Sequence, residues 1–310
     1  MINVEINVYG NCYRIPLTKG ACQEGGLQLS KPKYFIDSHA HLMTPYRVKG
    51  GIKWIRRSIK EYEQLDLGTS ADELLQQMKA AGADYVINYF YPLQPGESRE
   101  INRWQRDFAD RHHEVIPFAS LHPGDENKEA IIRESLEDFK LRGFKFHPYV
   151  QRFKILDPVM LPVYQSLQEI GCPINIHTGF SKFYGMESLK EEFLSLLSKF
   201  PRLKIIASHM LFGDMACSQW NGLLEQYPNL FLDTTNTLSF CSAGSKLTEQ
   251  MQKIISKYSS RIVFGSDYPM GMAYPVKLLY DLLEQVCPDR ETFEDLAWRT
   301  AAAMLKLDLE

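Results

Sequence analysis

The sequence predicts an α/β fold, a (β/α)8 TIM barrel with a small N-terminal β-extension. Eight short β-rich runs alternate with segments of helical periodicity, and histidines gather at the carboxyl ends of those runs. Parallel strands need helical crossovers, and eight such units close into a barrel. The predicted strands are Tyr34–His41, Asp84–Tyr91, Glu114–Leu121, Gly143–His147, Pro173–His177, Leu203–His209, Asn229–Thr235 and Arg261–Asp267.

Three connecting segments show the helical spacing most clearly, namely Ala71–Ala81, Glu187–Phe200 and Val276–Val286. Glycine or proline ends several of the intervening helices just before the next strand. An open doubly wound sheet would usually carry a glycine-rich phosphate turn after its first strand. Here that strand ends in histidines, which favours the barrel.

Two parts of the chain lie outside the repeat. Residues 1–33 have alternating apolar runs and turn residues, and we expect a β-extension packed on the barrel formed by residues 34–310. The connection Leu42–Ser70 is unusually long and contains Trp54. Long loops after barrel strands commonly form lids or substrate pockets.

Composition excludes several classes of protein. The 310 residues carry a net charge of −3, so there is no basic excess of the kind that nucleic-acid binders need. No apolar stretch approaches the length of a membrane span, and no signal peptide is visible. The six cysteines form no C-x-x-C pair. We therefore expect a cytoplasmic protein without nucleic-acid or membrane partners.

The first predicted strand ends Asp37-Ser38-His39-Ala40-His41. Residues i and i+2 of a strand face the same way, so His39 and His41 are placed to bind one cation at the barrel mouth. By the same alternation, Asp37 would lie one step deeper and orient a ligand by hydrogen bonding.

Three further strands end in groups that bind metals. His177 ends the fifth strand, His209 the sixth and Asp267 the eighth. Active sites of barrels are built at this rim from several strands. Such imidazoles and a carboxylate suit one divalent ion, zinc or a similar metal, with one position open for water.

This pattern of residues resembles that of the amidohydrolase superfamily, and specifically of its amidohydrolase-related (type 2) subfamily of hydrolases and decarboxylases. The resemblance rests on the strand-end pattern and on the motifs G-x-K-x-H-P at Gly143–Pro148, P-x-x-x-H-T-G at Pro173–Gly179 and G-S-D-Y-P at Gly265–Pro269. It extends from about Tyr34 to the C-terminus.

The resemblance implies that His39, His41, His177 and Asp267 bind the metal, and that His209 is an acid/base or carbonyl-polarising residue. Asp267 would share the proton handling with His209. Members of the superfamily with two metals bridge them with a carboxylated lysine after strand four, a role that Lys145 leaves open as an alternative. Self-association is common in the family, so a homodimer is a further expectation.

Five residues are candidates for substrate contacts. Lys145 and His147 share one face of the fourth strand, Tyr149 and Arg152 lie in the following loop, and His122 follows the third strand. Arg152 would grip a carboxylate through two hydrogen bonds. The alternative for each is structural: a hydrogen-bonded histidine at the rim, or a solvated arginine in a loop.

The sequence predicts a metal-dependent hydrolase that acts on a small carbonyl compound, an amide, ester or lactone, through a metal-activated water. The substrate would be a small molecule, with a carboxylate as one expected feature. Decarboxylation of an unsaturated or aromatic acid without oxidation is the alternative. A non-catalytic homologue that binds a metal or ligand is the alternative from another class. A serine hydrolase is not expected because no G-x-S-x-G elbow occurs.

Overall fold

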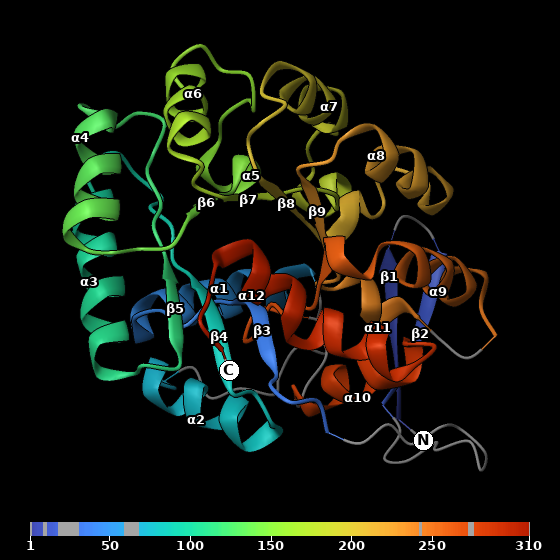
Figure 1. The fold of residues 1–310 in the computed structure, drawn as a ribbon. Helices are drawn as coiled ribbons and strands as arrows, with labels where there is room; N and C mark the ends of the chain where they lie inside the picture. Colours follow the sequence, from blue (N-terminus) through green and yellow to red (C-terminus); the bar gives the residue numbers. More distant parts are fainter. Residues whose placement is uncertain are drawn as a thin grey trace.

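A ring of parallel strands occupies the centre of the molecule, and helices surround it (Figure 1). The computed structural model describes residues 2–8, 11–17, 31–58, 68–241, 244–271 and 276–309. Within these ranges the ring contains eight strands, in an order that follows the chain. They are β3 (Ile36–Ala40), β4 (Tyr85–Tyr89), β5 (Val115–Phe118), β6 (Phe144–Phe146), β7 (Ile174–His177), β8 (Ile205–Ser208), β9 (Leu230–Asp233) and β10 (Ile262–Val263).

Backbone hydrogen bonds close the ring at two seams. Strands β3 to β5 form one sheet and β6 to β10 another. At the β5–β6 seam Ala119 pairs in parallel with Phe144, and the amide of Lys145 donates to the carbonyl of Ala119 at 2.8 Å. At the β10–β3 seam Ala40 pairs with Tyr268, and the amide of Asp267 donates to the carbonyl of His39 at 2.8 Å. The predicted TIM barrel is confirmed.

All eight predicted strands are present at the predicted places, with shorter ends. The largest difference is at β10, which ends at Val263 rather than Asp267. Gly265 has no room for a side chain there, since a Cβ would lie 2.5 Å from the Cβ of His39. Asp267 itself has a left-handed backbone with φ of 62°. The chain therefore leaves extended geometry before the aspartate.

Helices cross over between the strands as predicted. Among the three segments with clear helical spacing, α2 (Ala71–Ala81) begins at a capping box of Ser70 and Glu73. The others form α7 (Lys190–Lys199) and α10 (Lys277–Val286). The remaining helices are α1 (Pro45–Ser58), α3 (Ser98–Arg111), α4 (Lys128–Arg133), α5 (Pro148–Gln151), α6 (Leu161–Ile170), α8 (Trp220–Gln226), α9 (Lys246–Tyr258), α11 (Arg290–Glu294) and α12 (Thr300–Leu305).

The apolar core has two parts. The larger lies between the outer face of the strands and the surrounding helices. The smaller fills the inside of the barrel at its amino end, where Ile36, Ile87 and Ile206 pack with Ala301 and Leu305 of α12. In Figure 1 α12 lies across this end of the ring. Because apolar side chains fill one end, polar groups inside the barrel are left at the carboxyl ends of the strands.

Residues 2–8 and 11–17 form β1 (Ile2–Val8) and β2 (Asn11–Leu17), an antiparallel pair in the predicted β-extension. Its packing on the barrel and the boundary at residue 34 stay predictions. The long connection Leu42–Ser70 begins with α1, while residues 59–67 lie outside the described ranges. None of the helices in the described residues is both long and apolar enough to cross a bilayer.

The close approach of Gly143 to Phe118 predicts a stability difference between two glycine substitutions. A Cβ at Gly143 would lie 2.3 Å from the ring of Phe118, so Gly143→Ala should lower the free energy of unfolding by about 1–3 kcal/mol. Gly222 of α8 has nothing within 4 Å of its Cβ position, so Gly222→Ala should raise it by ~0.5–1 kcal/mol. Urea unfolding of both variants checks this. Equal stability of the two would contradict the described packing.

Candidate metal centre

Strand β3 carries an irregularity that separates Asp37 from the two histidines. The register with β4 shifts between Asp37 and Ala40, after Ile36 has packed inside the barrel, so Asp37 and His39 need not face the same side. The Asp37 carboxylate accepts hydrogen bonds from the Tyr280 hydroxyl of α10 at 3.0 Å and from the His39 amide at 3.2 Å. Asp37 thus links the backbone of β3 at His39 to α10, and its predicted role in orienting a ligand stays a prediction.

His39, His41 and Asp267 come together at the barrel mouth, and all three are buried. The Oδ1 atom of Asp267 lies 3.0 Å from Nε2 of His41 and 3.5 Å from Nε2 of His39. The two Nε2 atoms are 3.3 Å apart. His39 of β3, His41 directly after this strand and Asp267 in the turn after β10 therefore each point one ligand atom at a common place.

The hydrogen-bond partner of Nδ1 in each ring determines whether Nε2 carries a hydrogen or an electron pair. Nδ1 of His41 lies 2.8 Å from the carbonyl oxygen of Tyr89, which only accepts, so we assign the hydrogen to Nδ1. Nδ1 of His39 lies 2.6 Å from a carboxylate oxygen of Asp233, and the same assignment follows. Both Nε2 atoms then carry an electron pair instead of a hydrogen.

The charges at this place also suit a cation. Burial lowers the pKa of His39 well below its usual range, so the ring is neutral. Burial opposes ionisation of Asp267, but the basic side chains around it hold the pKa of its carboxyl below the usual value. Neutral imidazoles and a carboxylate are the donors that bind zinc and similar divalent ions. The residues present therefore fit one divalent ion.

Asp233 was not among the residues singled out from the sequence, although it ends β9 as Asp267 follows β10. Strand-end position alone was the signal that could have found it. Burial raises the pKa of the Asp233 carboxyl to about 7, while hydrogen bonds from Thr235 oppose that rise. A cation at Nε2 of His39 would favour the ionised carboxylate, because it makes the Nδ1–H a stronger donor.

His177 and His209 form a second, adjoining pair. Nδ1 of His209 lies 3.1 Å from the carbonyl oxygen of Thr235, and its Nε2 lies 3.0 Å from Nδ1 of His177. Burial lowers the pKa of His209 to about 4, so the ring is neutral and its Nε2 accepts from His177. Nε2 of His177 then carries an electron pair, and this buried atom has no hydrogen-bond partner among the residues that the structure describes. His177 lies outside the group of three, and its role as a ligand stays a prediction.

Left-handed backbone conformations position several of these groups. His209 and Asp267 both have φ of 62°, and Asn236 has φ of 57°. The Asn236 side-chain amide donates to Oδ2 of Asp267 at 2.7 Å, which leaves Oδ1 facing the histidines. Non-glycine residues adopt this conformation at a cost, and such positions cluster at functional sites.

Lys145 of β6 lies inside the barrel next to this group. Its Nζ donates to Oδ1 of Asn175 at 2.6 Å and to the hydroxyl of Ser208 at 3.0 Å, and it lies 3.4 Å from Nε2 of His39. Burial lowers the pKa of its ammonium group to about 7. The structure thus brings Lys145 to the centre, and its carboxylation stays an open alternative.

His147 and Tyr149 line the mouth with aromatic rings. The ring of His147 stacks on that of His177, with centroids 3.8 Å apart. The Tyr184 hydroxyl lies 3.2 Å from Nε2 of His147. Tyr149 stacks on Tyr184 and donates its hydroxyl hydrogen to Asp214 at 3.2 Å. These contacts place both candidates beside the metal-binding group.

The other two candidates lie in different surroundings. Nδ1 of His122 accepts the amide hydrogen of Gly124 at 3.0 Å, so this half-buried ring caps its own turn. Arg152 ends α5 with a left-handed backbone, and its side chain is exposed. A role in substrate binding stays a prediction for both, and the structural alternative describes the contacts of His122.

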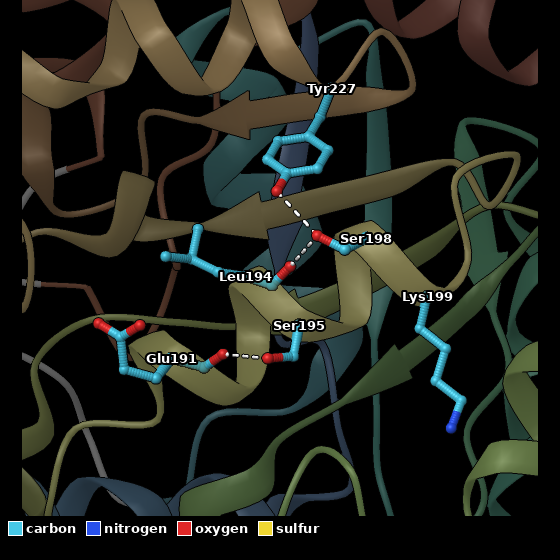
Figure 2. A pocket seen from close by; sticks show the side chains of 6 residues that line it. All are labelled: Glu191, Leu194, Ser195, Ser198, Lys199 and Tyr227. Carbon is cyan, nitrogen blue, oxygen red and sulfur yellow. Dashed lines mark hydrogen bonds between the residues drawn. The ribbon is translucent and has the colours of Figure 1, made fainter.

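A groove on the outer layer is unrelated to this mouth (Figure 2). Figure 2 shows its lining from α7 and the turn before β9. The hydroxyls of Ser195 and Ser198 bond within this region, to the carbonyl oxygens of Glu191 and Leu194. Its hydroxyl groups are thus already paired, and it contains none of the sequence-predicted site residues.

A family profile described as Amidohydrolase matches residues 36–307. No curated protein matches the chain.

Similar solved structures share the fold at low sequence identity. An uncharacterised TIM-barrel protein from Bordetella bronchiseptica has 18% identity and a TM-score of 0.65, covering 88% of this chain and 98% of that one. A 2,6-dihydroxybenzoate decarboxylase complexed with 2,6-dihydroxybenzoate has 16% identity and a TM-score of 0.66, covering 88% and 99%. A dihydroxybenzoic acid decarboxylase from Polaromonas sp. JS666, with bound manganese and 2-nitroresorcinol, has 16% identity and a TM-score of 0.65, covering 89% and 98%.

The hydrogen bond from His39 to Asp233 predicts an effect on metal affinity. Asp233→Asn should weaken binding of Mn²⁺ or Zn²⁺ by about 10–100-fold, because the imidazole loses the carboxylate that orients it. Equilibrium dialysis with metal analysis of the protein measures this. His122→Asn is the matched control and should bind as the wild type does. Unchanged affinity in Asp233→Asn would show that this hydrogen bond does not support a ligand.

Proposed function

The chain belongs to the amidohydrolase family, and on that premise we propose that it is a metal-dependent decarboxylase. Its substrate would be a small aromatic carboxylic acid, and its products would be CO2 and the corresponding arene. The observation that carries the proposal is the convergence of three electron pairs from His39, His41 and Asp267 at the barrel mouth.

The comparisons favour this reaction over the hydrolysis expected first from the sequence. Two of the similar structures are named decarboxylases of dihydroxybenzoic acids, and one holds manganese. The aromatic surroundings of the group support the same substrate class. The ring of Tyr91 lies 5.7 Å from His41 and 5.2 Å from His147, so flat faces border the metal-binding group. Planar rings pack well against such faces.

A divalent cation held by His39, His41 and Asp267, with His177 as a proposed fourth ligand, would orient the substrate and stabilise negative charge. Either zinc or manganese suits these donors. The chain's own residues prepare this place. Asp233 and the Tyr89 carbonyl fix the two rings so that Nε2 faces the group, and Asn236 does the same for Oδ1 of Asp267.

The reaction needs one proton for each molecule of CO2. The bond between the ring carbon and the carboxylate breaks, CO2 leaves, and the electron pair that remains on the carbon takes up a proton. Water supplies this proton, and we assign its relay to the carbon to Asp267 and His209. These two side chains are close enough for the charge of Asp267 to raise the pKa of His209 against the effect of burial.

An assay with 2,6-dihydroxybenzoate as the probe tests the reaction. The protein loaded with Mn²⁺ should release CO2 and 1,3-dihydroxybenzene, and in heavy water the product should carry one deuterium at the carbon that held the carboxylate. The metal-free protein is the control and should be inactive. Hydrolysis of an ester or lactone, with no CO2 from a panel of aromatic acids, would contradict the proposal and support the hydrolase alternative.

Replacement of His209 separates proton handling from metal binding. His209→Asn should lower kcat by about 10²–10⁴-fold, because it removes a group assigned to proton transfer. Metal content should stay at the wild-type level, since His209 is not one of the three convergent donors. Steady-state kinetics and elemental analysis give the two values. Full turnover with metal bound would remove His209 from the mechanism.

A further inference from the structure

We propose that Trp54 of α1 and Tyr184, at the end of the turn η2 (Ser181–Tyr184) after β7, form an aromatic cover over the metal centre. This cover controls access to the centre and selects planar substrates. The inference rests on the proposed function, because it assumes that a metal and an aromatic acid bind beneath the cover.

The order of strands shows that this contact crosses the mouth. Helix α1 follows β3 and η2 follows β7, and these are the first and fifth of eight strands in the ring. They therefore stand on opposite sides of the barrel. The rings of Trp54 and Tyr184 are nevertheless stacked, with centroids 5.4 Å apart and an interplanar angle of 20°. Phe183 meets Trp54 edge to face at 5.1 Å. A contact between opposite sides has to pass over the carboxyl ends of the strands.

Buried residues on both sides of Trp54, Ile55 among them, anchor α1, and Trp54 itself contacts η2. Arg47 pairs with Glu97 at 2.6 Å, and Val48 and Ile52 are buried. Gly51 approaches the side chain of Met270, in the segment after β10. Trp54 is still 38% exposed although it is stacked. Its ring can separate from Tyr184 without breaking the ion pair of Arg47.

The cover is connected directly to the metal centre. Tyr184 bonds to Nε2 of His147, whose ring stacks on that of His177. Tyr91 continues the run of rings from His147 to His41. A substrate that reaches the centre thus passes between aromatic faces, which favours a flat ring over a puckered one.

Loss of bound metal to a chelator measures access without needing turnover. The protein is loaded with Mn²⁺, freed of excess metal and mixed with EDTA. Trp54→Ala should release manganese about tenfold faster than the wild type, which is the factor that one aromatic pair contributes at the upper end of its range. Tyr184→Ala should do the same, and Trp54→Phe should stay near the wild-type rate because it keeps a ring.

Tyr46 provides the matched control. It is an aromatic residue of the same helix but is 83% exposed, so Tyr46→Ala should leave the rate unchanged. Equal release rates in the wild type, Trp54→Ala and Tyr184→Ala would overturn the cover. A rise in Tyr46→Ala as large as in Trp54→Ala would also overturn it, since the effect would then reflect a loosened helix.

Binding of two acids tests selection. The wild type should bind 2,6-dihydroxybenzoate more tightly than cyclohexanecarboxylate, and Trp54→Ala should lose about tenfold of that preference. An unchanged preference in Trp54→Ala, or none in the wild type, would overturn the selective role. If the wild type releases no CO2 but Trp54→Ala still loses metal faster, the proposed function is rejected. The proposal that the cover controls access to the metal is then retained. A wild type that retains no manganese would overturn both proposals.

Discussion

The rest of the site depends on one electrostatic constraint. Nε2 of His39, Nε2 of His41 and Oδ1 of Asp267 each direct an electron pair at one buried place, and hydrogen bonds on the far side of both rings fix that orientation. Electron pairs this close repel one another unless a positive charge lies between them. The protein therefore holds a set of donors that a divalent ion stabilises, and neutral rings need lose no proton to bind it.

The packing of the barrel holds these polar donors together at one end. Apolar side chains and α12 fill its amino end, so that polar groups gather at the other. The irregularity in β3 moves Asp37 to the helix layer and leaves the inside to the histidines. Left-handed backbones at His209 and Asp267 turn side chains toward the centre where an extended strand would not. Local strain at the mouth is thus supported by rigid packing below it.

Periodicity was enough to predict the eight strands, and strand-end position was enough to find His39, His41 and Asp267. The register irregularity after Asp37 could not be predicted, because the sequence there has no regular alternation from which a shift would stand out. Phe35 and Ile36 are both apolar, and the next three residues are all polar. Asp233 lies at a strand end as the histidines do, but it belongs to none of the sequence motifs that singled out the other residues. The stack of Trp54 across the mouth depends on the closure of the ring, which local sequence does not encode.

Anomalous X-ray scattering from crystals soaked separately with Zn²⁺ and Mn²⁺ would locate the bound metal directly. We expect one strong peak at the mouth, within about 2.0–2.3 Å of Nε2 of His39, Nε2 of His41 and Oδ1 of Asp267. A peak bound by other residues would show that these three side chains are not the metal ligands. So would the absence of any peak while these three side chains keep their described positions.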